Sequence, residues 1–173
     1  MSASWATDHI REIEDYPVPG VTFRDITPLL GDRAAFGRAV DDLVSRFHDV
    51  EVDRVVGIES RGFIIAAPVA YRLRAGFVPV RKAGKLPWAV AREEYQLEYG
   101  TDRLEIHRDA IRQDERILVV DDVLATGGTA SATCSLVEGL GGSIVGLGFM
   151  IELDDLGGRS RLGGRRTESL VRY

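Results

Sequence analysis

The sequence is poor in the residues that build disulfides and metal clusters. It contains one cysteine, Cys134, and three histidines, which lie in separate segments without the spacing of metal ligands. A single cysteine excludes an internal disulfide framework and a zinc site built on cysteines. Cys134 falls on the apolar side of an expected helix, and we interpret it as a small core residue.

Long hydrophobic runs and an excess of positive charge are also absent. No apolar segment approaches the roughly 20 residues of a membrane span, and the N-terminus has neither the basic nor the apolar region of a secretion signal. The 173 residues carry a net charge of -5, which disfavours nucleic acid and anionic membranes as partners. We therefore expect a cytoplasmic protein that forms one domain over residues 1–173.

The sequence does contain an alternation of strand-like and helix-like patterns. Apolar runs predict core strands at 54–58, 77–80, 117–120 and 142–151, with a last edge strand at 169–171. Apolar residues at helical spacing predict helices over 3–14, over 33–48 with Asp32 as N-cap, after Gly62, and from Ala130 to a stop at 141–142. This order predicts an α/β fold with a mostly parallel central sheet flanked by helices.

Two segments interrupt that alternation. Two prolines within residues 16–20 break the N-terminal helix, and a short extended piece follows at 21–26. Residues 83–105 are mostly polar, but 95–99 and 104–106 alternate around a turn signal at 100–102, which indicates a β-hairpin. Because long excursions between core strands usually cover or bind a ligand, we expect residues 83–105 to be a flexible lid loop.

Polar side chains follow three of the expected core strands at the point where each strand ends. They are Glu59-Ser60-Arg61, Arg81-Lys82 and Asp121-Asp122. Ligands of parallel α/β sheets bind at the carboxyl ends of the strands. Three such clusters at one sheet edge predict a binding site there.

Residues 117–129 combine a buried strand, two carboxylates, a loop of glycine and threonine, and a helix start. Backbone N–H groups at a helix start attract anions, while carboxylates beside them suit hydroxyls, so the combination fits a sugar phosphate. An acidic pair at a strand end is also found in response-regulator receiver domains, but there it follows the first strand and no Gly-Gly loop comes after it. The third interpretation of the acidic pair is a strand end that is only exposed to solvent.

Basic side chains predict a second anion site. Arg61 at a helix start is unfavourable with the helix dipole unless it meets an anion, and Arg81, Lys82 and Lys85 suit a polyanion. Composition alone favours plainer readings of two other residues. It makes Phe23 a core aromatic and Glu98 a solvent-facing strand residue.

The segment from Val119 to Ala130 resembles the phosphoribosyl-pyrophosphate (PRPP) signature of the type I phosphoribosyltransferases. Further motifs are similar to those of the family members that act on adenine, and the resemblance covers about the whole chain. These motifs lie at residues 15–25, 57–63, 77–87, 97–100 and 104–106.

The resemblance implies transfer of the phosphoribosyl group from PRPP to adenine, giving AMP and pyrophosphate, with Mg²⁺ held mainly by PRPP and pyrophosphate and not by a protein metal site. It also implies a homodimer, a hood segment at residues 1–30, and a non-proline cis peptide at the Glu59-Ser60 turn. A phosphoribosyltransferase for another purine base, or a non-catalytic PRPP-binding regulator, is the alternative.

The resemblance also implies a role for each motif residue. A loop cradles the 5′-phosphate: Ala125, Thr126, Gly127, Gly128 and Thr129. Asp121 and Asp122 hold the ribose hydroxyls. Pyrophosphate meets the strand-end groups and the loop that follows: Glu59, Ser60, Arg61, Arg81, Lys82 and Lys85.

At the base, the resemblance implies that Phe23 stacks on adenine while backbone groups near Thr22 and Arg24 read its edge. Glu98 handles the proton of the base, with Tyr99 beside it, and Arg61 is the second catalytic group. Trp88 and Ala89 depart from the family pattern, as does the basic tail after Gly158.

Overall fold

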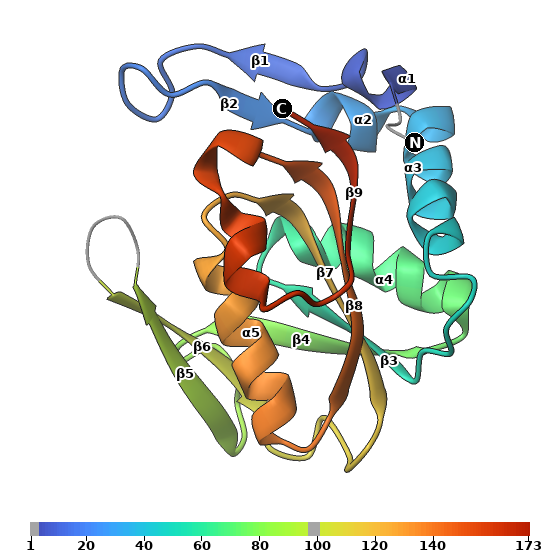
Figure 1. Cartoon of the computed structure of the whole chain (residues 1–173), viewed down its shortest axis with the longest axis vertical. Helices are drawn as coiled ribbons and strands as arrows, with labels where there is room; N and C mark the ends of the chain where they lie inside the picture. The colour runs from blue at the N-terminus through green and yellow to red at the C-terminus, as the bar shows by residue number, and fades with distance from the viewer. Residues whose placement is uncertain (1–3, 97–100) are drawn as a thin grey trace.

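The computed structural model describes residues 4–96 and 101–173. A seven-stranded sheet in the order β5-β6-β4-β3-β7-β8-β9 forms its centre, and a two-stranded sheet of β1 and β2 lies across one end (Figure 1). Strands β4, β3, β7, β8 and β9 are parallel, while β6 pairs antiparallel with β4 and β5 pairs antiparallel with β6. The predicted α/β fold is confirmed.

The strands have the following bounds: β1 Arg11–Ile13, β2 Phe23–Asp25, β3 Arg54–Ile58, β4 Gly76–Lys82, β5 Val90–Gln96, β6 Thr101–His107, β7 Arg116–Leu124, β8 Ser143–Glu152 and β9 Thr167–Arg172. The helices have these bounds: α1 Ser4–Thr7, α2 Thr27–Gly31, α3 Arg33–Ser45, α4 Arg61–Leu73, α5 Gly128–Gly139, and the 3₁₀ turns η1 Asp154–Leu156 and η2 Gly158–Leu162.

Helices cover both faces of the central sheet, as the alternation of patterns predicts (Figure 1). On one face α3 and α4 pack Leu43 and Ile65 against sheet residues such as Val120, all of them buried. On the other face α5 packs Cys134 and Val137 into a second apolar cluster. Cys134 is buried, and burial raises the pKa of its thiol to about 11, which suits a core residue.

The N-terminal helix predicted over residues 3–14 is wrong beyond its first turn. Helix α1 ends at Thr7, and β1 follows as a strand that pairs Ile13 with Phe23 of β2. The helical spacing there was weak. Backbone pairing with a strand ten residues later in the chain outweighed it, which is the usual way in which tertiary context overrides local propensity.

The boundaries of other strands and helices also differ from the predicted ones. Strand β7 does not end before the aspartates but continues to Leu124, because Val123 and Leu124 still pair with β8. The hairpin lies earlier than predicted, with β5 ending at Gln96 and β6 starting at Thr101. Asp32 does cap α3, accepting from the N–H groups of Ala34 and Ala35, but the helix ends at Ser45.

Candidate active site

Three neighbouring strands bring the predicted clusters to one edge of the sheet. Strands β4, β3 and β7 are adjacent, and their carboxyl ends carry Arg81, Glu59 and Asp121. The three clusters therefore lie at one edge of the sheet, where we expect the site. The cis peptide expected at Glu59-Ser60 is also present.

The predicted phosphate loop forms a turn between β7 and α5. Gly127 flanks the first residue of α5 with φ of +80°, a backbone conformation that favours glycine. A pocket opens at this turn and is lined by Asp121, Val123, Leu124, Ala125, Thr126, Gly127, Gly128, Thr129 and Ala130. The N-terminal end of α5 borders this pocket, and the backbone N–H groups of a helix start suit an anion.

The two aspartates lie in different surroundings. Asp121 accepts the N–H of Asp122 at 2.9 Å, and burial together with the neighbouring Asp122 carboxylate raises the pKa of Asp121 well above its ordinary value. The carboxylate of Asp122 pairs with Arg61, Oδ2 lying 2.9 Å from the guanidinium nitrogen Nη1. The site thus holds one carboxylate whose ionised form is disfavoured by burial and one that pairs with a cation.

Glu59 contacts three of the residues that were predicted to bind pyrophosphate. Its carboxylate accepts hydrogen bonds from the side chains of Arg81, at 3.3 Å from Nε, and of Lys85, and from the N–H of Lys82 at 3.1 Å. Burial acts to raise the pKa of Glu59, but these bonds prevail and lower it to about 2. The charged carboxylate of Glu59 therefore holds the members of this basic cluster together.

The side chain of Lys82 points to a different partner. Its ammonium group lies 3.1 Å from Asp102 Oδ2 on β6, and the Tyr95 hydroxyl lies 3.4 Å from the same oxygen. Tyr95 also lines a pocket together with Gly128 and Ser131 at the start of α5. The hairpin thus contacts both the predicted pyrophosphate-binding cations and the predicted phosphate loop, a connection that no motif spacing indicated.

The predicted base-binding segment lines an adjacent pocket. Its walls are Val21, Thr22, Phe23, Arg24, Arg61, Asp122, Val123, Ala125 and Leu153. Tyr16 packs edge-on against the Phe23 ring with centroids 5.3 Å apart, and the Arg61 guanidinium lies 5.3 Å over the same ring. Phe23 is therefore half-buried in a pocket wall and is not part of the main core.

The side chain of Arg24 is engaged elsewhere. It lies 4.1 Å over the ring of Tyr173 and forms an ion pair with Glu12. Arg24 nevertheless lines the pocket. No sequence motif pointed to Val123 or Leu153 in this pocket, although Leu153 directly follows β8 and so belongs to another strand end at the same edge.

Two predicted residues, Glu98 and Tyr99, lie outside the described residues. Ser60 precedes the first residue of α4, and its side chain forms no capping hydrogen bond there. Within residues 4–96 and 101–173, no three His, Cys, Asp or Glu side chains are grouped to hold a metal ion. None of the helices in this part of the chain has the length and apolar character needed to cross a membrane.

Known proteins with similar sequences point to one family. A family model described as a phosphoribosyl transferase domain matches residues 30–161. The adenine phosphoribosyltransferase of Acidothermus cellulolyticus is 58% identical over 164 residues, covering 95% of this chain and 93% of that protein. That of Chloroflexus aurantiacus is 56% identical over 164 residues, covering 95% of each.

Solved structures agree over nearly the whole chain. The adenine phosphoribosyltransferase of Thermoanaerobacter pseudethanolicus superposes with a TM-score of 0.96 at 46% identity, covering 99% of this chain and 100% of that one. The Saccharomyces cerevisiae enzyme, complexed with D-2,5-dideoxy-2,5-imino-altritol 1,6-bisphosphate and adenine, gives 0.92 at 38% identity and 98% coverage of each. With sequence and fold matched from end to end, this chain belongs to the phosphoribosyltransferase family and, within it, to the adenine phosphoribosyltransferases.

Proposed function

We propose that the site at the sheet edge carries out the family reaction by dividing its two substrates among three groups of residues. The reaction itself, transfer of the phosphoribosyl group from PRPP to adenine with release of pyrophosphate and formation of AMP, follows from the family and confirms the predicted enzyme function. One observation carries the division of labour. An anion loop, a basic cluster and a base-sized pocket lie side by side at the ends of β7, β3 and β4.

We assign the 5′-phosphate to the loop from Ala125 to Thr129 and the ribose hydroxyls to Asp121 and Asp122. The loop offers backbone N–H groups at a helix start, and the carboxylates stand between the two pockets. Anchoring the phosphate end supplies binding energy remote from the reacting carbon, which aligns that carbon with the base.

We assign pyrophosphate to Arg61 and to the basic cluster around Glu59, which consists of Arg81, Lys82 and Lys85. In the free protein these cations are held by carboxylates: Glu59 holds Arg81 and Lys85, and Asp102 holds Lys82. Pyrophosphate, as the leaving group, then replaces these carboxylate oxygens as the partner of cations that are already oriented. Preorganised charge of this kind is the main means of stabilising a departing polyanion.

Adenine takes the pocket of Phe23 and Leu153, with its edge toward the backbone of Thr22 and Arg24. Loss of pyrophosphate leaves an oxocarbenium-like ribosyl group at the carbon that the ring nitrogen of adenine attacks. We assign removal of the ring proton to Glu98, beside Tyr99, on the segment that joins β5 and β6. Residues 83–105 would act as the lid that keeps water from the ribosyl cation.

Magnesium fits this arrangement as a partner of PRPP. The carboxylate oxygens of Asp121 and Asp122 are donors of the kind that Mg²⁺ accepts, although the ion would be held mainly by pyrophosphate and the ribose hydroxyls. When bound, the ion neutralises part of the charge of the leaving group.

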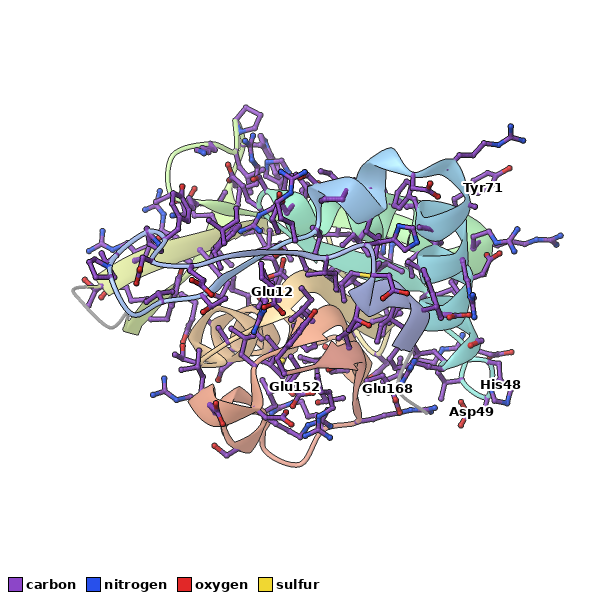
Figure 2. All side chains as sticks on the ribbon, turned by 90° about the horizontal axis from the view of Figure 1, so that it is seen from above. Glu12, His48, Asp49, Tyr71, Glu152 and Glu168 are labelled. Carbon is purple, nitrogen blue, oxygen red and sulfur yellow. The ribbon has the colours of Figure 1, made fainter. Side chains whose placement is uncertain are left out.

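A homodimer is part of the proposal. Helix α4 carries Ile64 and Tyr71 on its outer side, 46% and 82% exposed, and the ring of Phe63 in the same helix packs edge-on against the half-exposed Phe77 of β4. Figure 2 shows Tyr71 at the outer edge of the molecule. Exposed aromatic and aliphatic residues at one face suit an interface between copies of the chain. A cytoplasmic location stays a prediction.

AMP formation from PRPP in magnesium buffer, measured with each purine base, tests the assignment of the base pocket. We expect product with adenine and none with hypoxanthine, guanine or xanthine. Turnover of a 6-oxopurine at a comparable rate would contradict the assignment of the Phe23 pocket to adenine. Absence of turnover with every base would favour a PRPP-binding regulator.

A further inference from the structure

The C-terminal tail of the chain touches the phosphate loop backbone to backbone. The η2 turn starts at Gly158, which is buried and lies against residues 125–127. A methyl group at Gly158 would collide with the carbonyl oxygen of Ala125 and would lie 2.9 Å from the backbone nitrogen of Gly127. In the reverse direction, a methyl group at Gly127 would collide with the carbonyl oxygen of Gly158 and lie 3.1 Å from its Cα.

Both halves of this contact are rigid main chain. A side chain at the loop could rotate away from an intruding methyl group, but a carbonyl and an amide nitrogen cannot move without moving the whole turn. The φ of Gly158 is not positive, so its backbone conformation is open to other residues. Glycine is therefore required at 158 by the closeness of the loop and not by the conformation of the tail.

An ion pair with the buried carboxylate of Glu152 holds the tail in this position. Arg159 donates to Glu152, with 2.8 Å between Nε and Oε1 and 2.5 Å between Nη2 and Oε2, and to the carbonyl oxygen of Thr167 at 2.8 Å. Glu152 is 3% exposed and also accepts from the Ser169 hydroxyl. In Figure 2 Glu152 lies among the ribbons of the C-terminal segments. Bidentate pairing leaves little freedom to the residue next to Gly158.

The other end of the turn is held by packing. Leu162 is fully buried in the same apolar cluster as α5. The turn is thus tied to β8 and β9 at one end and to the helix behind the loop at the other. No side chain of the tail lines the pocket of the loop.

We propose that Gly158 is a positioning residue for the 5′-phosphate loop, with the Glu152–Arg159 pair holding it in place. The backbone N–H groups of residues 125–129 can point at a phosphate only if the turn keeps its shape, and the tail backs this turn from behind. The proposal rests on the assignment of this loop to the 5′-phosphate.

Gly158→Ala tests the proposal, with Gly157→Ala as a matched control. A methyl group at Gly157 meets nothing within 4 Å but sits at a φ of +62°, so the control strains the tail without touching the loop. We expect Gly158→Ala to weaken the binding of AMP, measured by calorimetry, by about 10- to 100-fold, as ångström-scale displacement of a binding group does. The KM for adenine, which carries no phosphate, should change far less than the AMP affinity, since Ala125 is the only residue of the loop among the walls of its pocket.

Equal loss of AMP and adenine affinity, or an unchanged AMP affinity in folded Gly158→Ala, would overturn the proposal. If Gly158→Ala does not fold, Arg159→Lys decides in its place. It keeps the charge but loses the bidentate pairing, and must show the same selective loss for AMP.

A second pair of substitutions tests whether the loop itself binds the 5′-phosphate. Thr126→Ala together with Thr129→Ala alters the loop itself. If that pair leaves AMP affinity unchanged, the loop does not bind the 5′-phosphate. If the pair weakens AMP binding while folded Gly158→Ala does not, the loop assignment stands and the role of Gly158 is wrong.

Discussion

At the scale of single residues, the site depends on one close approach between a helix and a strand. A methyl group at Gly62, in the first turn of α4, would lie 2.5 Å from Asp121 Oδ1 and 3.3 Å from Asp121 Cα. Arg61 precedes this contact and pairs with Asp122. The absence of a side chain at Gly62 therefore sets the distance between the α4 cation and the β7 carboxylates.

Gly62→Ala should lower kcat/KM for PRPP by about 10- to 100-fold, because the methyl group displaces Asp121 and shifts Arg61 against Asp122. Gly37→Ala is the control, since Gly37 also lies in a helix but a methyl group there meets nothing within 4 Å. The control should keep full activity and raise stability by about 0.5–1 kcal/mol. Steady-state kinetics and urea unfolding measure both; wild-type kinetics for Gly62→Ala would refute the close-packing argument.

Asp121→Asn should stabilise the protein near pH 7 while lowering PRPP affinity. Burial raises the pKa of Asp121, so the ionised side chain destabilises the folded state at pH values above the folded pKa. Below the unfolded value of 3.8 the carboxyl group is protonated in both states and the penalty is gone. Asparagine can still accept the N–H of Asp122.

The stability gain of Asp121→Asn, measured by urea unfolding, should therefore be present at pH 7 and shrink as the pH approaches 3.5. Asp155→Asn, at an exposed position of η1, should show no such pH-dependent gain. A loss of stability in Asp121→Asn at pH 7 would mean that the charge is compensated in the fold.

Glu98→Ala should keep PRPP binding and lose most of kcat, by about 10²- to 10⁴-fold, the usual share of general acid–base catalysis. Glu94→Ala is the control on the same hairpin, because Glu94 is exposed and pairs with Arg103 on β6. Unchanged turnover of Glu98→Ala in a steady-state assay removes Glu98 from the mechanism, while equal losses in both variants would point to damage of the hairpin.

At the scale of elements, the hairpin is joined to β4 by a buried carboxylate. Glu105 of β6 accepts from the N–H of Gly84 at 2.9 Å and from Arg92 Nε on β5 at 2.7 Å. Its side chain is 3% exposed, and the backbone bond from Gly84 helps to lower its pKa. One residue thus fixes the turn that presents Lys85 to the basic cluster.

Glu105→Ala should raise the KM for PRPP more than the KM for adenine, since the freed turn no longer holds Lys85 in place. Glu105→Gln keeps an acceptor for the N–H of Gly84, so its KM for PRPP should lie between the values of Glu105→Ala and the wild type. Initial-rate measurements with each substrate varied in turn decide this. A larger effect on adenine than on PRPP would place the turn in the base site.

At the scale of the whole molecule, the two faces of the central sheet are both covered, yet α4 keeps apolar residues on its outer side. Helix α4 packs Ile65 and Val69 inward, while Ile64 and Tyr71 face outward. A helix with apolar residues on both sides usually packs against a second partner. That partner, in our proposal, is another copy of the chain.

Tyr71→Glu should shift the protein from dimer to monomer in sedimentation or light-scattering measurements, because a buried unpaired carboxylate is costly at an interface. Leu156→Glu is the control, since Leu156 is half-exposed on η1, far along the chain from α4. If both variants keep the wild-type mass, α4 is not the interface. If the wild type is already a monomer, the homodimer is wrong.

The sequence by itself determined the α/β alternation and the chemistry at the strand ends. Strand 54–58 and the edge strand near 169–171 appear where apolar runs predict them, and Glu59, Arg81 and Asp121 meet at one sheet edge. These features depend on short-range spacing and on the rule that parallel strands align their carboxyl ends. Both can be read along the chain without knowing any distant partner.

Only the tertiary structure decided which distant groups meet. It turned part of the expected N-terminal helix into β1, set Arg24 on Tyr173, gave Glu59 its basic partners and laid Gly158 against Ala125. Each of these contacts joins residues at least ten positions apart. Such contacts depend on the whole packing of the sheet, which no local pattern of side chains contains.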